Sequence, residues 1–386
     1  MKAAWPTPNL LGSSPARSWT EAKGLLSQVA VLVRSSRAWS LGDFVRDVEG
    51  QMTANKNFKR RVRARATKTG QSYTAALRHF RPPTGDEMPK RMRLSVAQTI
   101  LREDPRNSDD LRESGRDIGR LMREAHDAGA RLIHFPEGAT CCPNKRVMSI
   151  DGPETVGASD WDRFEWDVLH RVLQETAELA RDLRLWTVLG AVHRLTEPNR
   201  PHNSLYVISD TGKVVTRYDE RFLSNTKISY MYTPGSAPTT FTIDGFRFGC
   251  SLGMEAHFPE VFGEYERLDV DCVLLSTAGG GTPNTGAFAT EAQAHALTNS
   301  YWVSFSVDAQ EGMDAPAGVV SPRGEWLARC PQNGTSSMVT VDLDEREEDL
   351  AGVLLGSRPW RRTARGGVYD PHIVRDDPRS ADRTIF

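Results

Sequence analysis

The chain has 386 residues, of which 39% are hydrophobic and 26% are charged, a composition typical of globular proteins. Its mean hydropathy is −0.48, and no apolar run reaches the roughly 18 residues of a membrane-spanning helix, which excludes such a helix. The first residues lack the apolar core of a secretory signal, so we expect none. The cysteines number 5, form no CxxC pair and have no metal-ligand spacing. We therefore expect reduced thiols, a cytoplasmic location and no metal site.

The positive and negative charges are unevenly distributed along the chain. Residues 1–91 contain 17 Lys and Arg against 6 Asp and Glu, whereas residues 92–386 contain 32 against 44. The contrast predicts a basic, mostly helical N-terminal extension ending near residue 91. Its densest part, residues 56–81, holds nine positive charges and no acidic residue. It is either an arm that binds nucleic acid or a helical face that docks on the acidic main domain. The second is favoured, because no base-reading motif accompanies the charge.

Residues 92–345 alternate between strand and helix patterns, which predicts an α/β fold with the layers of a four-layer αββα sandwich. We expect strands at 93–99, 131–135, 186–192, 202–208, 214–218, 241–243, 246–252, 272–276, 302–307, 317–320 and 337–342, and helices at 109–128, 161–183 and 289–299. Residues 346–386 form a C-terminal arm. From residue 358 onward it is polar and without periodicity, which predicts either disorder or an arm laid across a partner subunit.

Several sequence motifs of this domain occur in a characteristic order. They are FPEGA, NSLYVISDTGKVVTRYDERFL, YTPG, FGCSLGMEAHFPE, NSYWVSF and GVVSPRGEWLA. In this order they resemble the nitrilase (carbon–nitrogen hydrolase) superfamily. The resemblance implies an αββα fold, a homodimer or higher homo-oligomer, a small-molecule substrate and no cofactor. It also implies a Glu-Lys-Cys set, in which the Cys attacks a nitrile or amide carbon, the Glu is the general base and the Lys stabilises developing charge.

When the roles of the family are assigned to the matching positions of this chain, some of the residues differ from the family pattern. Glu137 matches the base. In the motif that resembles Tyr-x-Lys-x-x-Leu, Glu220 occupies the Lys position, and Lys227 stands seven residues later, where a second Glu is expected. The nucleophile position, five residues before Phe258, falls on Gly253. The resemblance therefore implies a site that has lost its nucleophile.

This loss has chemical consequences. Without a thiolate no covalent thioester or thioimidate forms, so the covalent route of the family is closed. Glu137 and Glu220 should face each other, and two close carboxylates cannot both ionise easily, so we expect the pKa of one to rise. Lys227 can pair with one of them. The space left by the missing side chain at Gly253 can take a water molecule or part of a substrate.

Four further residues are candidates for this pocket. Glu255 is either a second catalytic carboxylate or a structural hydrogen-bonding one. Met254 follows the nucleophile position, and His257 is either a pocket residue or an ordinary histidine. Cys142, five residues past Glu137, is the candidate for a relocated nucleophile, although attack geometry tolerates little misplacement.

Three functions remain open at this point. The first is an enzyme that acts on an amide, nitrile or related C–N bond by acid–base chemistry without a Cys adduct. The second is a catalytically inactive scaffold or regulator that acts through its dimer interface and basic arm. The third is an ordinary amidohydrolase that uses Cys142. The first is favoured, because Glu137 is present and the charges of the pocket are rearranged rather than erased.

Overall fold

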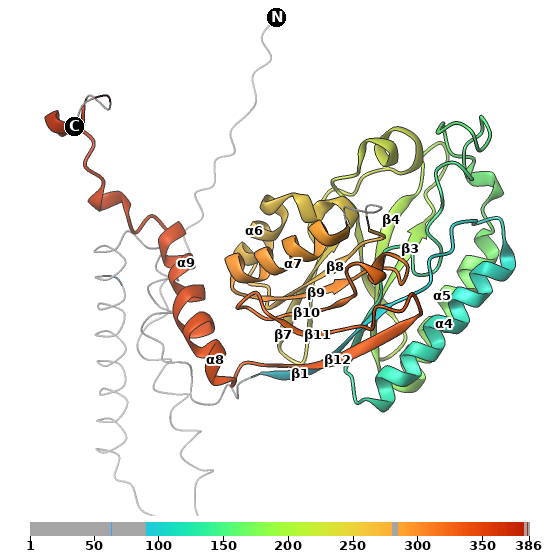
Figure 1. Ribbon diagram of the computed structural model, residues 1–386, viewed down its shortest axis with the longest axis horizontal. Helices are drawn as coiled ribbons and strands as arrows, with labels where there is room; N and C mark the ends of the chain where they lie inside the picture. Colours follow the sequence, from blue (N-terminus) through green and yellow to red (C-terminus); the bar gives the residue numbers. More distant parts are fainter. Residues whose placement is uncertain (1–62, 64–89, 280–284, 382–383, 385–386) are drawn as a thin grey trace, which may run out of the picture. The chain divides into compact units, whose positions relative to one another are not determined.

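The computed structural model describes residue 63, residues 90–279 and 285–381, and residue 384 (Figure 1). The chain divides into two units, Met1–Lys68 and Thr69–Phe386. Of the first unit only the exposed, helical Arg63 is described, so the helices expected between residues 1 and 91 lie outside the described residues. All elements discussed below belong to the second unit.

The second unit is built on two six-stranded mixed sheets. The first has the order β12 (Ser337–Asp344), β1 (Arg91–Gln98), β2 (Leu132–His134), β3 (Trp186–His193), β4 (His202–Ile208) and β5 (Val214–Asp219). The second has the order β11 (Trp326–Arg329), β10 (Gly318–Val320), β9 (Trp302–Ser306), β8 (Cys272–Ser276), β7 (Phe246–Leu252) and β6 (Thr240–Ile243). Strands β1–β3 and β7–β9 run parallel, and the outer strands pair antiparallel.

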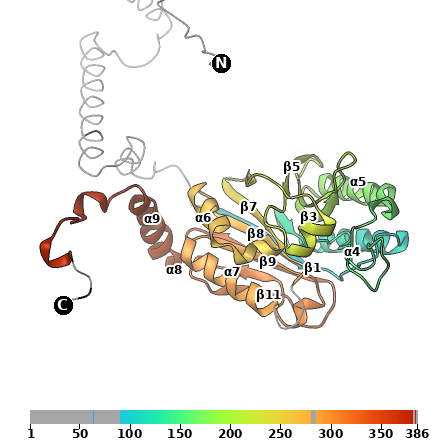
Figure 2. The ribbon, with the colours of Figure 1, turned by 90° about the horizontal axis from the view of Figure 1, so that it is seen from above.

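Helices cover the outer face of each sheet. Helices α4 (Ser108–Asp127) and α5 (Trp166–Leu183) lie on the first sheet, and α6 (Pro259–Arg267) and α7 (Thr285–Asn299) lie on the second (Figures 1 and 2). The order of layers is therefore helix, sheet, sheet, helix. This confirms the αββα sandwich expected from the alternating pattern.

Helix α4 shows how the sequence sets these layers. Its apolar residues at helical spacing are all buried, which orients one face of the helix toward the first sheet. Asn107 begins the helix by accepting hydrogen bonds from the backbone N–H groups of Asp109 and Asp110. Gly129, with φ of +76°, follows its last turn and lets the chain reverse into β2.

The two sheets pack on a common apolar core that contains one polar bridge. His134, the last residue of β2, is fully buried, and its ring nitrogens lie 2.9 Å from Ser304 Oγ and 2.7 Å from Ser276 Oγ. Burial lowers the pKa of His134 to about 3, so the ring is neutral at physiological pH. The bridge ties β2 to β8 and β9 and fixes the strand end from which Glu137 continues.

The helical and strand predictions differ from the structure at a few places. The helix expected over 161–183 begins at Trp166, after a separate turn at Trp161–Arg163. Helix α6 and strand β11 were not predicted. Of the two alternatives for the chain from residue 358, disorder does not hold for its first part, because α9 spans Arg358–Arg365; the arm across a partner subunit stays a prediction.

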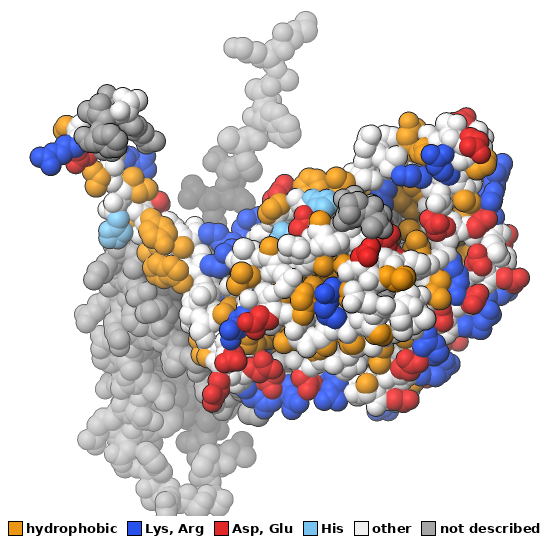
Figure 3. Space-filling model, in the orientation of Figure 1, with side chains coloured by type: hydrophobic (Ala, Val, Ile, Leu, Met, Phe, Trp, Pro, Cys, Tyr) orange, Lys and Arg blue, Asp and Glu red, His pale blue; other side chains and the backbone are white. Residues whose placement is uncertain are grey.

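The C-terminal arm contains helices and exposed apolar groups. Helix α8 spans Glu348–Ala351 and precedes α9. Beyond the sandwich, Figure 3 shows hydrophobic side chains gathered on this segment, and the exposed ones include Leu355, Trp360 and Tyr369. Within the described part of the chain, no helix combines the length and the apolar character needed to cross a membrane.

Candidate functional site

The site forms where strands of both sheets end. Glu137 follows β2 and Glu220 follows β5 in the first sheet, and Gly253 follows β7 in the second. Lys227 begins a helical turn, Lys227–Met231, that returns toward the same place. Side chains that follow strand ends at the same edge of a sandwich can meet there, and here they do.

Ion pairs and hydrogen bonds join these side chains into one cluster. Lys227 Nζ lies 2.5 Å from Glu137 Oε1 and 2.8 Å from Glu220 Oε2. Asn203, on β4, donates from Nδ2 to the same two oxygens, at 2.8 Å and 2.6 Å. The backbone N–H of Ala278 donates to Glu137 Oε2 at 3.1 Å. Each carboxylate is therefore held by charged and neutral donors together.

The electrostatics of the cluster depend on burial. The Glu220 side chain is 0% exposed and the Lys227 side chain 20%. Burial raises the pKa of Glu220 to about 8, with the charge of Glu137 acting in the same direction and that of Lys227 opposing it. For Lys227, burial alone lowers the pKa, but the charges of Glu137 and Glu220 outweigh it and raise the pKa above its usual value. Near neutral pH the cluster therefore holds a charged ammonium, and the free carboxyl oxygen of Glu220 is the natural position for a proton.

Gly253 faces the cluster without a side chain, which leaves a gap beside its backbone. It has φ of +52° in the turn from β7 into the short helix Gly253–His257, a conformation that suits glycine, and nucleophiles are displayed on such strand-to-helix turns. A β-carbon at this residue would lie 2.8 Å from Glu220 Oε1, 2.9 Å from Lys227 Nζ and 3.0 Å from Glu137 Oε2. Three polar atoms thus converge on the point where a side chain of residue 253 would begin.

Glu255 lies beside the cluster and holds its framework. It is fully buried and accepts hydrogen bonds from Tyr218 Oη, from the backbone N–H groups of Arg221, Phe222 and Leu252, and from Ser251 Oγ. These donors come from the segments that carry Glu220 and Gly253. Both oxygens of Glu255 are occupied by protein donors, which favours the structural interpretation over a catalytic one.

The other candidates fall outside the cluster. Met254 is 36% exposed. His257 Nδ1 lies 2.7 Å from Glu291 Oε1 on α7, and its ring packs near Phe288. Burial, with the charge of Glu137, raises the pKa of the Cys142 thiol well above its usual value, so a thiolate is disfavoured there. Within the described ranges no group of His, Cys, Asp and Glu could hold a metal ion.

The sequence analysis did not identify two groups that contribute to the site. Asn203 stands in the NSLYV motif, but nothing in the sequence assigned it a role. It would have been found by pairing the strands, because β4 lies next to β5 and Asn203 lies beside the end that carries Glu220. The backbone N–H of Ala278 carries no sequence signal at all.

Comparison with known proteins finds a matching family and relatives that are named as hydrolases or amidases. Residues 105–349 match the carbon–nitrogen hydrolase family. Hydrolase Rv0480c of Mycobacterium tuberculosis is 26% identical over 272 residues, which cover 66% of this chain and 90% of that protein. The deaminated glutathione amidase of Bos taurus is 22% identical over 286 residues, with 66% and 82% covered.

Solved structures share the fold. An amidase from Nesterenkonia sp. superposes with a TM-score of 0.53 at 18% identity, covering 67% of this chain and 94% of that one. Since the family match spans 245 residues, from 105 to 349, and so more than half of the 386, the chain belongs to the carbon–nitrogen hydrolase family.

Proposed function

We propose that the protein hydrolyses the C–N bond of a small amide, or hydrates a related nitrile, by activating water directly. The observation that carries this proposal is that Glu137 Oε2, Glu220 Oε1 and Lys227 Nζ all face Gly253, 2.8–3.0 Å from where a β-carbon of that residue would lie. That position is one bond length from the Gly253 backbone, so the catalytic water molecule would lie further out, between the three groups, in contact with a base, an acid and a cation at once.

Each of the three groups has a role that its environment supports. Glu137 is the general base, because its Oε2 faces the gap while Oε1 is held by Lys227 and Asn203. Glu220 is the general acid: Oε2 already accepts two hydrogen bonds, and the buried Oε1 has no hydrogen-bond partner among the described residues. Lys227 stabilises the oxyanion by its charge.

For an amide substrate, Glu137 takes one proton and Glu220 gives one proton in each reaction cycle. The water oxygen bonds to the carbonyl carbon as its proton passes to Glu137, and the carbonyl oxygen gains negative charge near Lys227. The C–N bond then breaks as the proton of Glu220 passes to the leaving nitrogen. The products are a carboxylic acid and an amine or ammonia, and a proton moving from Glu137 to Glu220 restores the site.

This mechanism uses no cysteine, whereas a solved structure with the same fold has one in its active site. A mutant of the amidase from Nesterenkonia sp. AN1 carries the acetamide moiety of fluoroacetamide on that cysteine. Here residue 253 is glycine, and burial raises the pKa of the Cys142 thiol. The alternative function is a catalytically inactive scaffold or regulator, and the missing thiol at residue 253 supports it too. Experiments distinguish this alternative from direct hydrolysis.

The first test measures ammonia released by the full chain from short aliphatic amides and nitriles. We expect Glu137→Gln to lower the rate by at least about 100-fold, the scale of general base catalysis. Glu260→Gln is the matched control: Glu260 is exposed and has no hydrogen bond or ion pair in the described part of the chain. The control should keep the wild-type rate.

The second test separates direct hydrolysis from a covalent route. Intact-mass spectrometry after rapid acid quench should detect no acyl adduct, and thiol alkylation should leave activity intact. An adduct, or loss of activity on alkylation, would assign the reaction to Cys142. If wild type neither binds nor reacts, while Gly253→Cys/Glu220→Lys/Lys227→Glu shows amidase activity, the inactive scaffold is the correct function.

A further inference from the structure

A groove between α4 and α5 gathers arginine side chains on the outer face of the first sheet. Its volume is about 540 Å³, within the range of small-molecule sites. Four arginines line it, and one acidic residue, Glu175, lies among them. The arginines are Arg112, Arg116 and Arg123 from α4 and Arg171 from α5.

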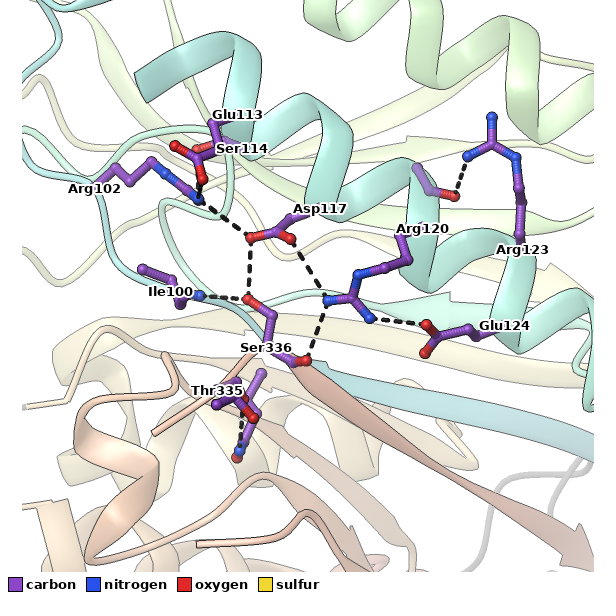
Figure 4. Close-up of polar contacts among 12 residues, drawn as sticks. Ile100, Arg102, Glu113, Ser114, Asp117, Arg120, Arg123, Glu124, Thr335 and Ser336 are labelled. Atoms are coloured by element: carbon purple, nitrogen blue, oxygen red, sulfur yellow. Dashed lines mark hydrogen bonds and ion pairs between the residues drawn. The ribbon is translucent and has the colours of Figure 1, made fainter. Parts of the chain in front are cut away.

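Among the described residues, three of these four arginines lack the acidic partners that arginines have on the neighbouring face of α4. On the neighbouring face of α4, Arg102 binds Glu113 and Asp117, and Arg120 binds Glu124 and Asp117, as Figure 4 shows.

The arginines of the groove differ from the arginines at that face in their ion pairs. In the part of the chain that the structure describes, Arg116, Arg123 and Arg171 form no ion pair, and Arg123 and Arg171 donate only to backbone carbonyls of their own helices. Arg112 pairs only with Asp109, whose side chain is 90% exposed, and such a pair is weak. The groove therefore carries more positive than negative charge.

The floor of the groove is formed where α4 and α5 pack closely. Glycines stand at two α4 positions, and Val172 and Leu179 of α5 lie 3.2 Å and 3.5 Å from where β-carbons of Gly115 and Gly119 would be. The absence of side chains on α4 lets the two helices approach each other, so the floor is shallow and Val172 is buried within it. A molecule in the groove would thus lie on the helix backbones and meet guanidinium groups at the rim.

We propose that this groove binds a compact polyanion with at least two phosphate or carboxylate groups. Guanidinium groups match both anions by paired N–H donors. The ligand is a separate small molecule, because the groove has the volume of a small-molecule site.

The test titrates the full chain by calorimetry with pyrophosphate, citrate and ADP at low ionic strength. We expect binding that weakens with salt and falls by at least about tenfold in Arg116→Ala/Arg171→Ala. Arg116→Lys should bind with intermediate strength, because it keeps the charge and loses the paired donors. Arg267→Ala is the matched control: Arg267 is an exposed arginine of α6 without an ion pair among the described residues, and its loss should change nothing.

Binding of pyrophosphate, citrate or ADP that the double variant loses supports the proposal, and a preference for pyrophosphate or for citrate identifies the anion. Unchanged binding in the double variant would assign the anion to residues 56–81 and overturn the proposal, as would no binding of any probe at millimolar concentration. Binding of polyglutamate alone would overturn it in favour of an acidic protein surface.

Discussion

At the scale of single residues, Glu220 is the carboxyl group of the candidate site whose pKa is raised into the range above neutral pH. Its Oε2 accepts from Lys227 and Asn203, and its Oε1 faces the gap at Gly253. Because burial raises the pKa of Glu220 to about 8, the native site keeps this proton in the neutral range. A proton on Oε1 would point at the atom that a substrate or water places in the gap.

The pH profile of activity tests this role of Glu220. We expect kcat/KM to fall as pH rises through about 8, because the general acid loses its proton there. Glu220→Gln cannot titrate, so its activity, lower by about 100-fold or more, should show no such limb. The measurement is kcat/KM from about pH 6 to pH 10, with circular dichroism to show that both proteins stay folded. If the limb persists in Glu220→Gln, another group is the acid.

The residues of the cluster differ in how well the sequence predicts them. The resemblance to the carbon–nitrogen hydrolase family assigned Glu137, Glu220, Lys227 and Gly253 to one pocket, and the structure brings them together. The contact of Lys227 with both carboxylates could not be predicted, since it depends on the path of the turn that begins there. Asn203 needed the register of β4 against β5, which a single sequence does not contain.

At the scale of elements, the site depends on how closely the Glu137 loop approaches β3. A β-carbon at Gly190, on β3, would lie 2.1 Å from Pro136 O and 2.8 Å from Gly138 N. Both neighbours are backbone atoms, so no side-chain rotation can make room. The absence of a side chain at Gly190 therefore lets the loop that carries Glu137 pack directly on β3.

Gly190→Ala should move this loop and with it the base. We expect activity to fall by about 100-fold, the cost of a misplacement of about 1 Å, and the melting temperature to fall by several degrees, since the clash costs about 1–3 kcal/mol. Gly352→Ala is the control, because nothing lies within 4 Å of its β-carbon position. Wild-type activity in Gly190→Ala would show that the loop is not fixed by β3.

The elements themselves were largely predictable. Strands such as β4, β7 and β8 have the predicted bounds, because buried strands appear as short apolar runs between turn residues. Helix α6 was missed because it starts at Pro259, directly inside a family motif, and is only 9 residues long. Strand β11 is short and half exposed, so its apolar pattern is weak.

At the scale of the whole molecule, the charge distribution explains the missed C-terminal helix. Residues 92–386 carry 32 basic and 44 acidic residues, and α9 supplies arginines to part of this excess. Arg358 reaches Asp271, Arg361 reaches Glu266, and Arg362 reaches Asp269. The helix is held by charge rather than by an apolar face, so hydrophobic periodicity gave no signal for it.

Arg358 is the contact that should decide whether α9 stays in place. It is 8% exposed, and its Nη2 lies 2.7 Å from Val270 O and 2.9 Å from Asp271 Oδ1. We expect Arg358→Ala to cost about 1–3 kcal/mol of local stability, because Asp271 loses a buried partner but keeps Lys90 and the backbone N–H of Arg247. The rate of hydrogen exchange over α9 should rise clearly. The sandwich, whose core α9 does not fill, should melt within a few degrees of wild type.

Two further variants serve as controls. Arg358→Lys should show an intermediate exchange rate over α9, since it keeps the charge but not the paired donors. Arg375→Ala changes an exposed arginine and should leave the exchange rate of α9 at its wild-type value. Equal exchange of α9 in Arg358→Ala and wild type would mean that its other arginines suffice to hold it.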